Sequence, residues 1–119
     1  MLDASNALVR LHKEQFGRGP VHARSNFAGP DTLICVMEDV LLPAERKMVA
    51  LGDHIGVRNA RTAFQAATTR ECVSAIEQIV SRKVHAFASA IDPDNNTVFE
   101  CFTFEPGDPS SDGHQTPAA

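Results

Sequence analysis

The sequence predicts an α+β domain in which helices pack on an antiparallel four-stranded sheet built from two hairpins. Segments with helical apolar spacing and segments of alternating or continuous apolar residues follow one another in the order α-β-β-α-α-β-β. Turns rich in Gly, Pro, Asp and Asn join the members of each strand pair. The chain of 119 residues is long enough to bury one hydrophobic core.

The first predicted helix covers residues 3–16 and ends at a backbone break. Gly17 and Gly19 permit conformations that other residues avoid, and Pro20 favours an extended exit. If Gly19 adopts a positive φ, Gly19→Val should harm folding. The chain then alternates over residues 20–27, so the sequence predicts a first strand there.

A second strand is predicted over residues 32–39, after a turn that contains Gly29 and Pro30. It is apolar on both faces from Leu33 to Met37, which is typical of a central strand. We therefore expect both of its faces to be covered, either by this chain or by a second subunit. A homodimer is the simplest arrangement.

Two helices and two strands complete the predicted domain. Pro43 suits the first position of a short helix, which Gly52 can close. The longest helix follows over residues 53–82. Strands over 84–91 and 97–105 flank a turn that is dense in Asp, Asn and Pro.

On the long helix, the predicted apolar stripe is interrupted by polar residues. At about 100° per residue, one side collects apolar residues together with Arg61, Thr68 and Glu71. Two interpretations are open for Arg61: it extends to water or pairs across a subunit interface, or it reaches the first strand and helps to hold an anion. The apolar members of this predicted stripe are Val57, Ala60, Phe64, Ala67, Cys72, Ala75 and Ile79.

Composition separates the domain, residues 1–105, from a tail, residues 106–119. The tail has three prolines, two glycines and no large apolar side chain, so we expect it to be disordered. The whole chain has 11 basic and 15 acidic residues, a net charge of −4 that argues against nucleic-acid binding.

Cysteine usage and hydropathy predict a cytoplasmic protein. Three cysteines lie far apart in apolar segments, which is typical of free, packed thiols in a reducing compartment. No apolar run is long enough to cross a bilayer, and the N-terminus has no signal-peptide pattern. We therefore expect any contact with the membrane to be peripheral, at its inner face.

The predicted binding residues surround the backbone break. His22 and Arg24 share one face of the first strand, and Arg18 precedes that strand, so the three could hold a small anion, with Arg61 as a fourth member. The alternative is structural: Arg18 and Arg24 bind helix carbonyls, or pair with Glu38 or Glu45. We predict no catalytic residue, metal site or cofactor, because the histidines, cysteines and paired carboxylates match no known motif.

An ordered set of short motifs resembles the MpsC family of small bacterial domains. The motifs span residues 3–105: Ser5-Asn6-Ala7, Leu11 to Glu14, Phe16 to Pro20, Ala23-Arg24, Leu33 to Val36, Leu42 to Glu45, Val57-Arg58, Phe64-Gln65, and Arg82 to Val84 before Ala86-Phe87. Members commonly carry Thr where this chain has Leu42, and leucine cannot cap the short helix.

The resemblance implies a companion of a Na+-translocating, membrane-potential-generating system. From it we predict an accessory or regulatory protein of a membrane ion or inorganic-carbon transport system. Its partners would be a transporter subunit, a second copy of the chain, or a small anion such as bicarbonate or a phosphate-bearing metabolite. Two alternatives are a small enzyme, which needs His22 or His85 beside an acid in a pocket, and a structural interaction module with a flat apolar sheet face.

Overall fold

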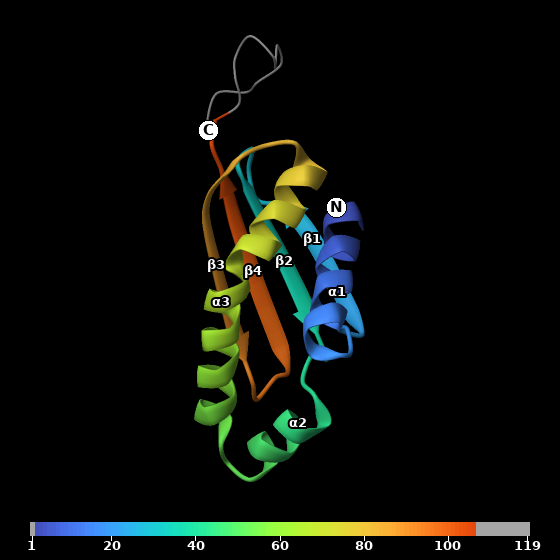
Figure 1. Ribbon diagram of the computed structural model, residues 1–119, viewed down its shortest axis with the longest axis vertical. Helices are drawn as coiled ribbons and strands as arrows, with labels where there is room; N and C mark the ends of the chain where they lie inside the picture. The colour runs from blue at the N-terminus through green and yellow to red at the C-terminus, as the bar shows by residue number, and fades with distance from the viewer. Residues whose placement is uncertain (1, 107–119) are drawn as a thin grey trace.

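The computed structural model describes residues 2–106, and its elements follow the predicted order (Figure 1). The elements are α1 (Leu2–Phe16), β1 (His22–Phe27), β2 (Thr32–Glu38), α2 (Pro43–Ala50), α3 (His54–Val80), β3 (Val84–Asp92) and β4 (Thr97–Phe104). The α+β class is confirmed. The predicted disorder of the tail falls on residues 107–119, which lie outside the described residues.

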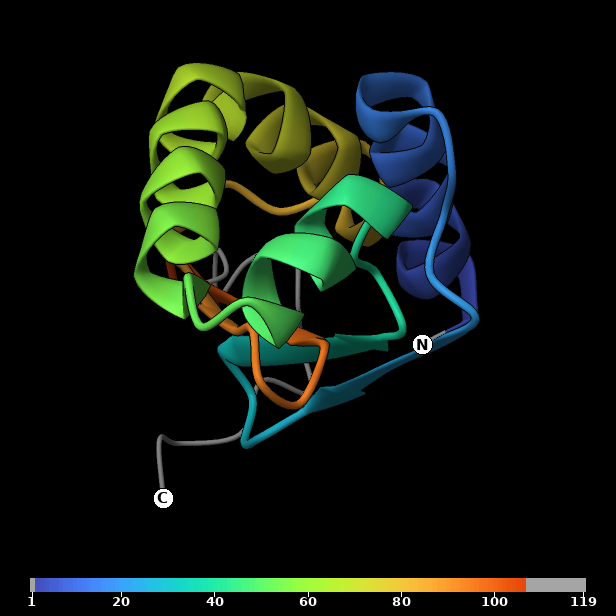
Figure 2. The same ribbon diagram turned by 90° about the horizontal axis from the view of Figure 1, so that it is seen from below.

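The four strands form one antiparallel sheet in the order β1-β2-β4-β3. The two predicted hairpins are present, and they join where β2 pairs with β4. β2 is therefore an inner strand, as its apolar sequence predicts. All three helices lie on one side of the sheet (Figure 2). Within residues 2–106, the other side has no covering element.

We call this second side the open face. Side chains alternate along each strand, so every second residue belongs to it. Its members are His22, Arg24 and Asn26 on β1, Thr32, Ile34, Val36 and Glu38 on β2, Thr97, Phe99, Cys101 and Thr103 on β4, and Ala86, Ala88, Ala90 and Asp92 on β3.

The hydrophobic core lies between the sheet and the helix layer. Alternate residues of β2 and β4 point into it, and α1 and α3 close it from above. Its largest fully buried side chains include Phe102, Leu33, Met37, Leu41, Ile76, Val40 and Val57. Burial of this apolar surface stabilises the sheet against the helices.

The end of α1 differs from the prediction in one respect. Gly17 has a φ of 83°, and its N–H donates to the Lys13 carbonyl at 2.8 Å, which closes the helix. Gly19 does not have a positive φ, so the backbone argument does not apply to it. A Cβ there would lie 3.3 Å from Val9 Cγ1, a tight approach that favours glycine.

The buried stripe of α3 also differs from the prediction. Val57 and Cys72 are buried as expected, but Phe64 is 36% exposed, and Ala60 and Ala67 are exposed as well. The stripe runs through Gln65 instead, and Phe64 lies one residue, or about 100°, to its side. From that flank the Phe64 ring contacts the Phe16 ring, with centroids 4.7 Å apart.

Candidate functional site

The four predicted binding residues do not form one cluster. Arg18, just after α1, donates to the backbone carbonyls of Asp39 at 3.2 Å and Leu41 at 3.0 Å. His22 and Arg24 lie on the open face. Arg61 lies on the opposite side of the sheet, inside the helix layer, and is only 6% exposed. The structure thus brings His22 and Arg24 together and separates Arg61 from them.

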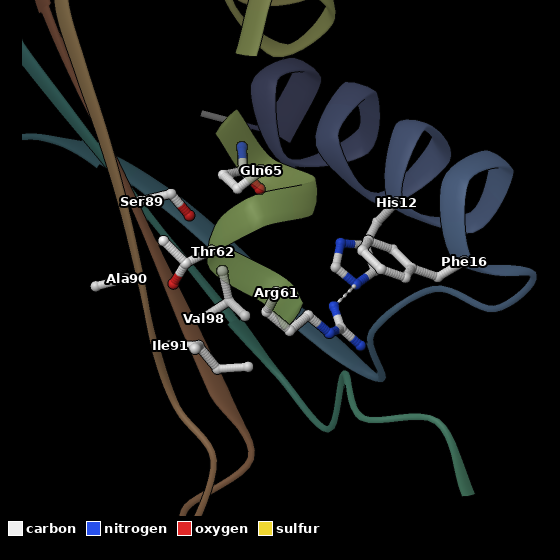
Figure 3. A pocket seen from close by; sticks show the side chains of 9 residues that line it. All are labelled: His12, Phe16, Arg61, Thr62, Gln65, Ser89, Ala90, Ile91 and Val98. Carbon is white, nitrogen blue, oxygen red and sulfur yellow. Dashed lines mark hydrogen bonds between the residues drawn. The ribbon is translucent and has the colours of Figure 1, made fainter. Parts of the chain in front are cut away.

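Arg61, on α3, is enclosed by residues of α1, of α2 and of the segment between β2 and α2; Figure 3 shows the α1 residues His12 and Phe16 beside it. Its Nε and Nη2 donate to the two carboxylate oxygens of Glu45, on α2, at 2.7 and 2.6 Å. Its Nη1 lies 3.1 Å from His12 Nε2, on α1, and its guanidinium carbon lies 4.0 Å from the Phe16 ring centroid. Nη2 also reaches the Val40 carbonyl at 3.2 Å. Arg61 therefore pairs within its own chain.

The charges of this cluster balance. A guanidinium can only donate, so His12 Nε2 must accept, and the ring is neutral with its proton on Nδ1. Burial, and then the nearby Arg61 charge, lower the pKa of His12 to about 4. Burial alone would raise the pKa of Glu45, but hydrogen bonds from Arg61 and the Leu42 N–H outweigh it and keep that pKa below its usual value. One cation thus faces one anion, which ties α1, α2 and α3 together.

The Glu45 carboxylate also replaces the missing helix cap. Leu42 precedes α2 and makes no side-chain cap, as the sequence indicates. Glu45 Oε1 instead accepts from the Leu42 backbone N–H at 2.8 Å, which satisfies one free donor of the helix start. The same carboxylate therefore orders the start of α2 and neutralises Arg61.

A row of polar side chains crosses the buried side of the sheet, which the sequence analysis missed. Ser25 pairs with Cys35, Cys35 with Glu100, and Glu100 with Ser89, one residue from each strand. Ser25 Oγ also lies 2.7 Å from Ser5 Oγ on α1. The sequence signal was present in β4, where Glu100 interrupts the apolar side of an alternating strand.

Glu100 is the most perturbed acid of the described residues. It is 3% exposed, and burial raises its pKa to about 8, although a hydrogen bond from Ser89 opposes that rise. Its Oε2 has no hydrogen-bond partner among the described residues. At neutral pH the group is therefore mainly a protonated carboxylic acid. A buried polar group whose oxygen has no hydrogen-bond partner costs stability.

A small pocket lies between α1, α3 and the β3–β4 hairpin (Figure 3). Its volume of about 20 Å3 fits one or two water molecules. This is far smaller than the pockets of several hundred cubic ångströms that bind metabolites. It is lined by His12, Phe16, Arg61, Thr62, Gln65, Ser89, Ala90, Ile91 and Val98.

The open face has an apolar centre and a polar rim. Phe99 is 45% exposed at the centre, beside Ile34, Val36 and Cys101. Along one edge, Arg24 Nη1 donates to Glu38 Oε1 at 2.7 Å. Among the three cysteines, Cys35 and Cys72 are buried, and only Cys101 is partly exposed. This distribution resembles a protein interface, with large apolar residues inside and charged residues outside.

His22 and Glu38 lie opposite each other at the rim of the open face, in a shallow hollow that Val21, Ala23 and Arg24 also line. This is the histidine-beside-acid arrangement that the enzyme alternative requires. The hollow is open to solvent, and Glu38 is already bonded to Arg24. His85 is exposed on β3.

The end of the molecule formed by α2 and the start of α3 presents two exposed aliphatic side chains. Leu51 is 74% exposed and Ile55 is 60% exposed. Exposed cations lie one helical turn away on either side, Lys47 before Leu51 and Arg58 after Ile55. We call this group, together with exposed Arg46, the basic tip.

Comparison with protein families matches residues 3–106 to the family described as "Na+-translocating membrane potential-generating system (MpsC)". Comparisons with curated proteins and with solved structures found no match. Within residues 2–106, no helix combines the length and the apolar character needed to cross a membrane. The same part of the chain has no group of three or more His, Cys, Asp or Glu side chains placed to hold a metal ion.

Proposed function

Because this chain belongs to the MpsC family, we propose that it is an accessory protein of a Na+-translocating membrane system and acts by binding at the inner face of the membrane. The basic tip is the observation that carries this proposal. It combines two exposed aliphatic side chains with three cations, Arg46, Lys47 and Arg58, on one end of the fold. Aliphatic side chains can enter the headgroup region while cations attract anionic lipid.

The expected membrane affinity is weak and reversible. Leu51 and Ile55 would each contribute at most about 1.5–3 kcal/mol if they were fully buried in the bilayer. Each cation adds about 1 kcal/mol near an anionic surface. Asp53, between the two aliphatic residues, opposes that attraction. An affinity of this size suits a protein that binds reversibly to the membrane beside a transporter.

Vesicle flotation tests the contact. We expect the protein to float with vesicles that contain phosphatidylglycerol, to float poorly with phosphatidylcholine alone, and to lose binding as salt rises. The double substitution Leu51→Asp and Ile55→Asp should abolish flotation. Leu2→Asp is the matched control, because Leu2 is as exposed as Leu51 but lies on α1, away from the tip. Equal flotation of both variants would refute the proposal.

A cellular measurement tests the accessory role. In cells that lack the gene, we expect the wild-type chain and Leu2→Asp to restore the Na+-dependent membrane potential. The double variant at Leu51 and Ile55 should restore it less well. Full restoration by the double variant would show that the tip is not required for the accessory role.

Anion binding on the open face is the second candidate function. It is supported by the exposed guanidinium of Arg24, which lies with His22 in a concave part of the surface. An anion there would compete with Glu38 for Arg24. Arg18 would have to give up its present carbonyl partners in order to join such a site, and Arg61 lies on the other side of the sheet. These existing contacts make His22 and Arg24 the favoured ligands.

Calorimetry with bicarbonate, phosphate and common nucleotides tests this candidate. Arg24→Ala should weaken binding about 10- to 150-fold, because a charge-assisted hydrogen bond contributes about 1.5–3 kcal/mol. Arg24→Lys should recover only part of that loss, since an ammonium lacks the guanidinium fork. Equal binding by the wild type and Arg24→Ala would eliminate this site.

A further inference from the structure

We infer that the open face is the interface between two copies of this chain, packed sheet against sheet around a two-fold axis that runs along the strands. This inference does not depend on the proposed membrane contact, because the basic tip lies at the end of the molecule and outside the open face. It identifies the surface and the arrangement of the dimer. It rests on the shape and the charge of the open face.

The apolar centre of the open face is the first argument. Phe99, Ile34 and Val36 lie side by side on the two inner strands, and partly exposed Cys101 lies next to them. A monomer would leave these residues in contact with water on a flat sheet, which costs free energy. A second sheet at about 10 Å would cover them, as in β-sandwiches.

Side-chain size is complementary under the proposed symmetry. The rotation places β1 of one copy over β3 of the other, and β2 over β4. The long side chains of β1, such as Arg24, then lie over the short side chains of β3, such as Ala90. In the same row, Val36 lies over Phe99 of the partner subunit. Large residues therefore meet small ones at the edges, and apolar residues meet at the centre.

Charge also favours this symmetry. On the β1 edge, the exposed Arg24 guanidinium is paired with Glu38, and His22 lies beside them, whereas Asp92, with Asp94 in the following turn, makes the β3 edge acidic. Placing β1 over β3 brings the Arg24 guanidinium of each copy toward the acidic edge of the other, where it can share its charge between Glu38 and these carboxylates. A two-fold axis across the strands would instead place β1 over β1 and bring Arg24 close to its own copy. Like charges in contact disfavour that second arrangement.

The size of the face predicts a weak dimer. Four strands about 4.8 Å apart, each of about seven residues with a rise of about 3.4 Å, cover about 19 by 24 Å. Two such faces bury about 900 Å2 in total, slightly below the range of stable interfaces. We therefore expect monomer and dimer to exchange at micromolar concentrations.

Cys101 provides an internal probe of the interface. It lies in the apolar centre, and Cys35 and Cys72 are buried in the core of each copy. Burial raises the pKa of Cys72 to about 11, which further slows its alkylation. Facing sheets lie about 10 Å apart, beyond the Cα separation of about 7 Å that a disulfide tolerates. Dimerisation should therefore shield Cys101 without oxidising it.

The experiment combines sedimentation with thiol labelling of the full chain. From low to high micromolar concentration, we expect the apparent mass to double and the N-ethylmaleimide labelling of Cys101 to slow, as followed by peptide mass spectrometry. Phe99→Asp should raise the dissociation constant at least about 100-fold, because the two-fold symmetry places two unpaired carboxylates in the apolar centre. Leu2→Asp, on the helix side, should change neither measurement.

A second variant guards against misfolding. Ala90→Arg is on an exposed edge strand, where the fold tolerates a long side chain, yet it should disrupt the packing of β1 of the partner subunit over β3. Circular dichroism of each variant reports its folding. A chain that stays monomeric at high micromolar concentration would overturn the inference. So would a dimer that persists in both folded variants, or Cys101 labelling that does not depend on protein concentration.

Discussion

Glu100→Gln should make the protein more stable at neutral and alkaline pH. Glutamine has nearly the shape of the protonated acid but cannot ionise, so it removes the cost of keeping a carboxyl group neutral in the core. The folded pKa of Glu100 is about 8, against 4.5 for a free side chain. The folded state therefore holds a proton that the unfolded state releases between these two values.

The sign and size follow from proton linkage. A raised acid pKa adds stability that is complete below pH 4.5 and is lost as the pH rises through about 8. His12 acts in the opposite direction, because its pKa is lowered to about 4, so its contribution is lost as the pH falls from about 6.5. The two effects largely cancel between about pH 4.5 and 6.5. From pH 6.5 to 8, only Glu100 acts, and the wild type should lose about 2 kcal/mol.

Urea unfolding followed by far-UV circular dichroism measures this, since the chain has no Trp or Tyr to report by fluorescence. A single low protein concentration avoids a contribution from association. At pH 7, we expect Glu100→Gln to be more stable than the wild type by about 3 kcal/mol. This is the free energy needed to keep the carboxyl group protonated at about 2.5 pH units above its free pKa of 4.5.

Glu14→Gln, on the exposed side of α1, should leave the wild-type pH dependence unchanged. Parallel stability curves for the wild type and Glu100→Gln from pH 6.5 to 8 would refute the reasoning. So would a Glu100→Gln protein that is less stable at pH 7, because it would show that the carboxyl group makes contacts that an amide cannot replace.

Three further predictions concern packing. Arg61→Ala should cost about 3–5 kcal/mol in urea unfolding, because it removes a buried side chain and leaves the partly buried Glu45 carboxylate unpaired; a loss below about 1 kcal/mol would contradict the structural role of Arg61. Phe102→Ala, in the core, should lower the free energy of unfolding by about 3–5 kcal/mol, and Phe64→Ala should lower it clearly less, because Phe64 is partly exposed. Equal losses for the two variants would show that Phe64 is buried, as the sequence predicted. Gly17→Ala should lower stability by about 1–2 kcal/mol because of the positive φ, and an unchanged melting temperature would contradict this.

The amino-acid sequence alone determined the elements and their order. Strand alternation, helical spacing and turn residues act over a few neighbouring positions, so they can be recognised without the fold. The central position of β2 was predictable for the same reason, since an apolar run on both faces is typical of an inner strand. The failure at Phe64 shows the limit, because residues one position apart differ by about 100° around a helix.

The site depended on tertiary structure. Arg61 and Glu45 are 16 residues apart, and His12 is 49 residues from Arg61, so no local pattern joins them. The buried row through Glu100 exists only because four strands align in one register. Ionisation and hydrogen bonding depend on such distant neighbours and on burial. The sequence alone therefore identified which residues carry charge, whereas the fold decided that Arg61 is enclosed and that His22 and Arg24 remain on the open face.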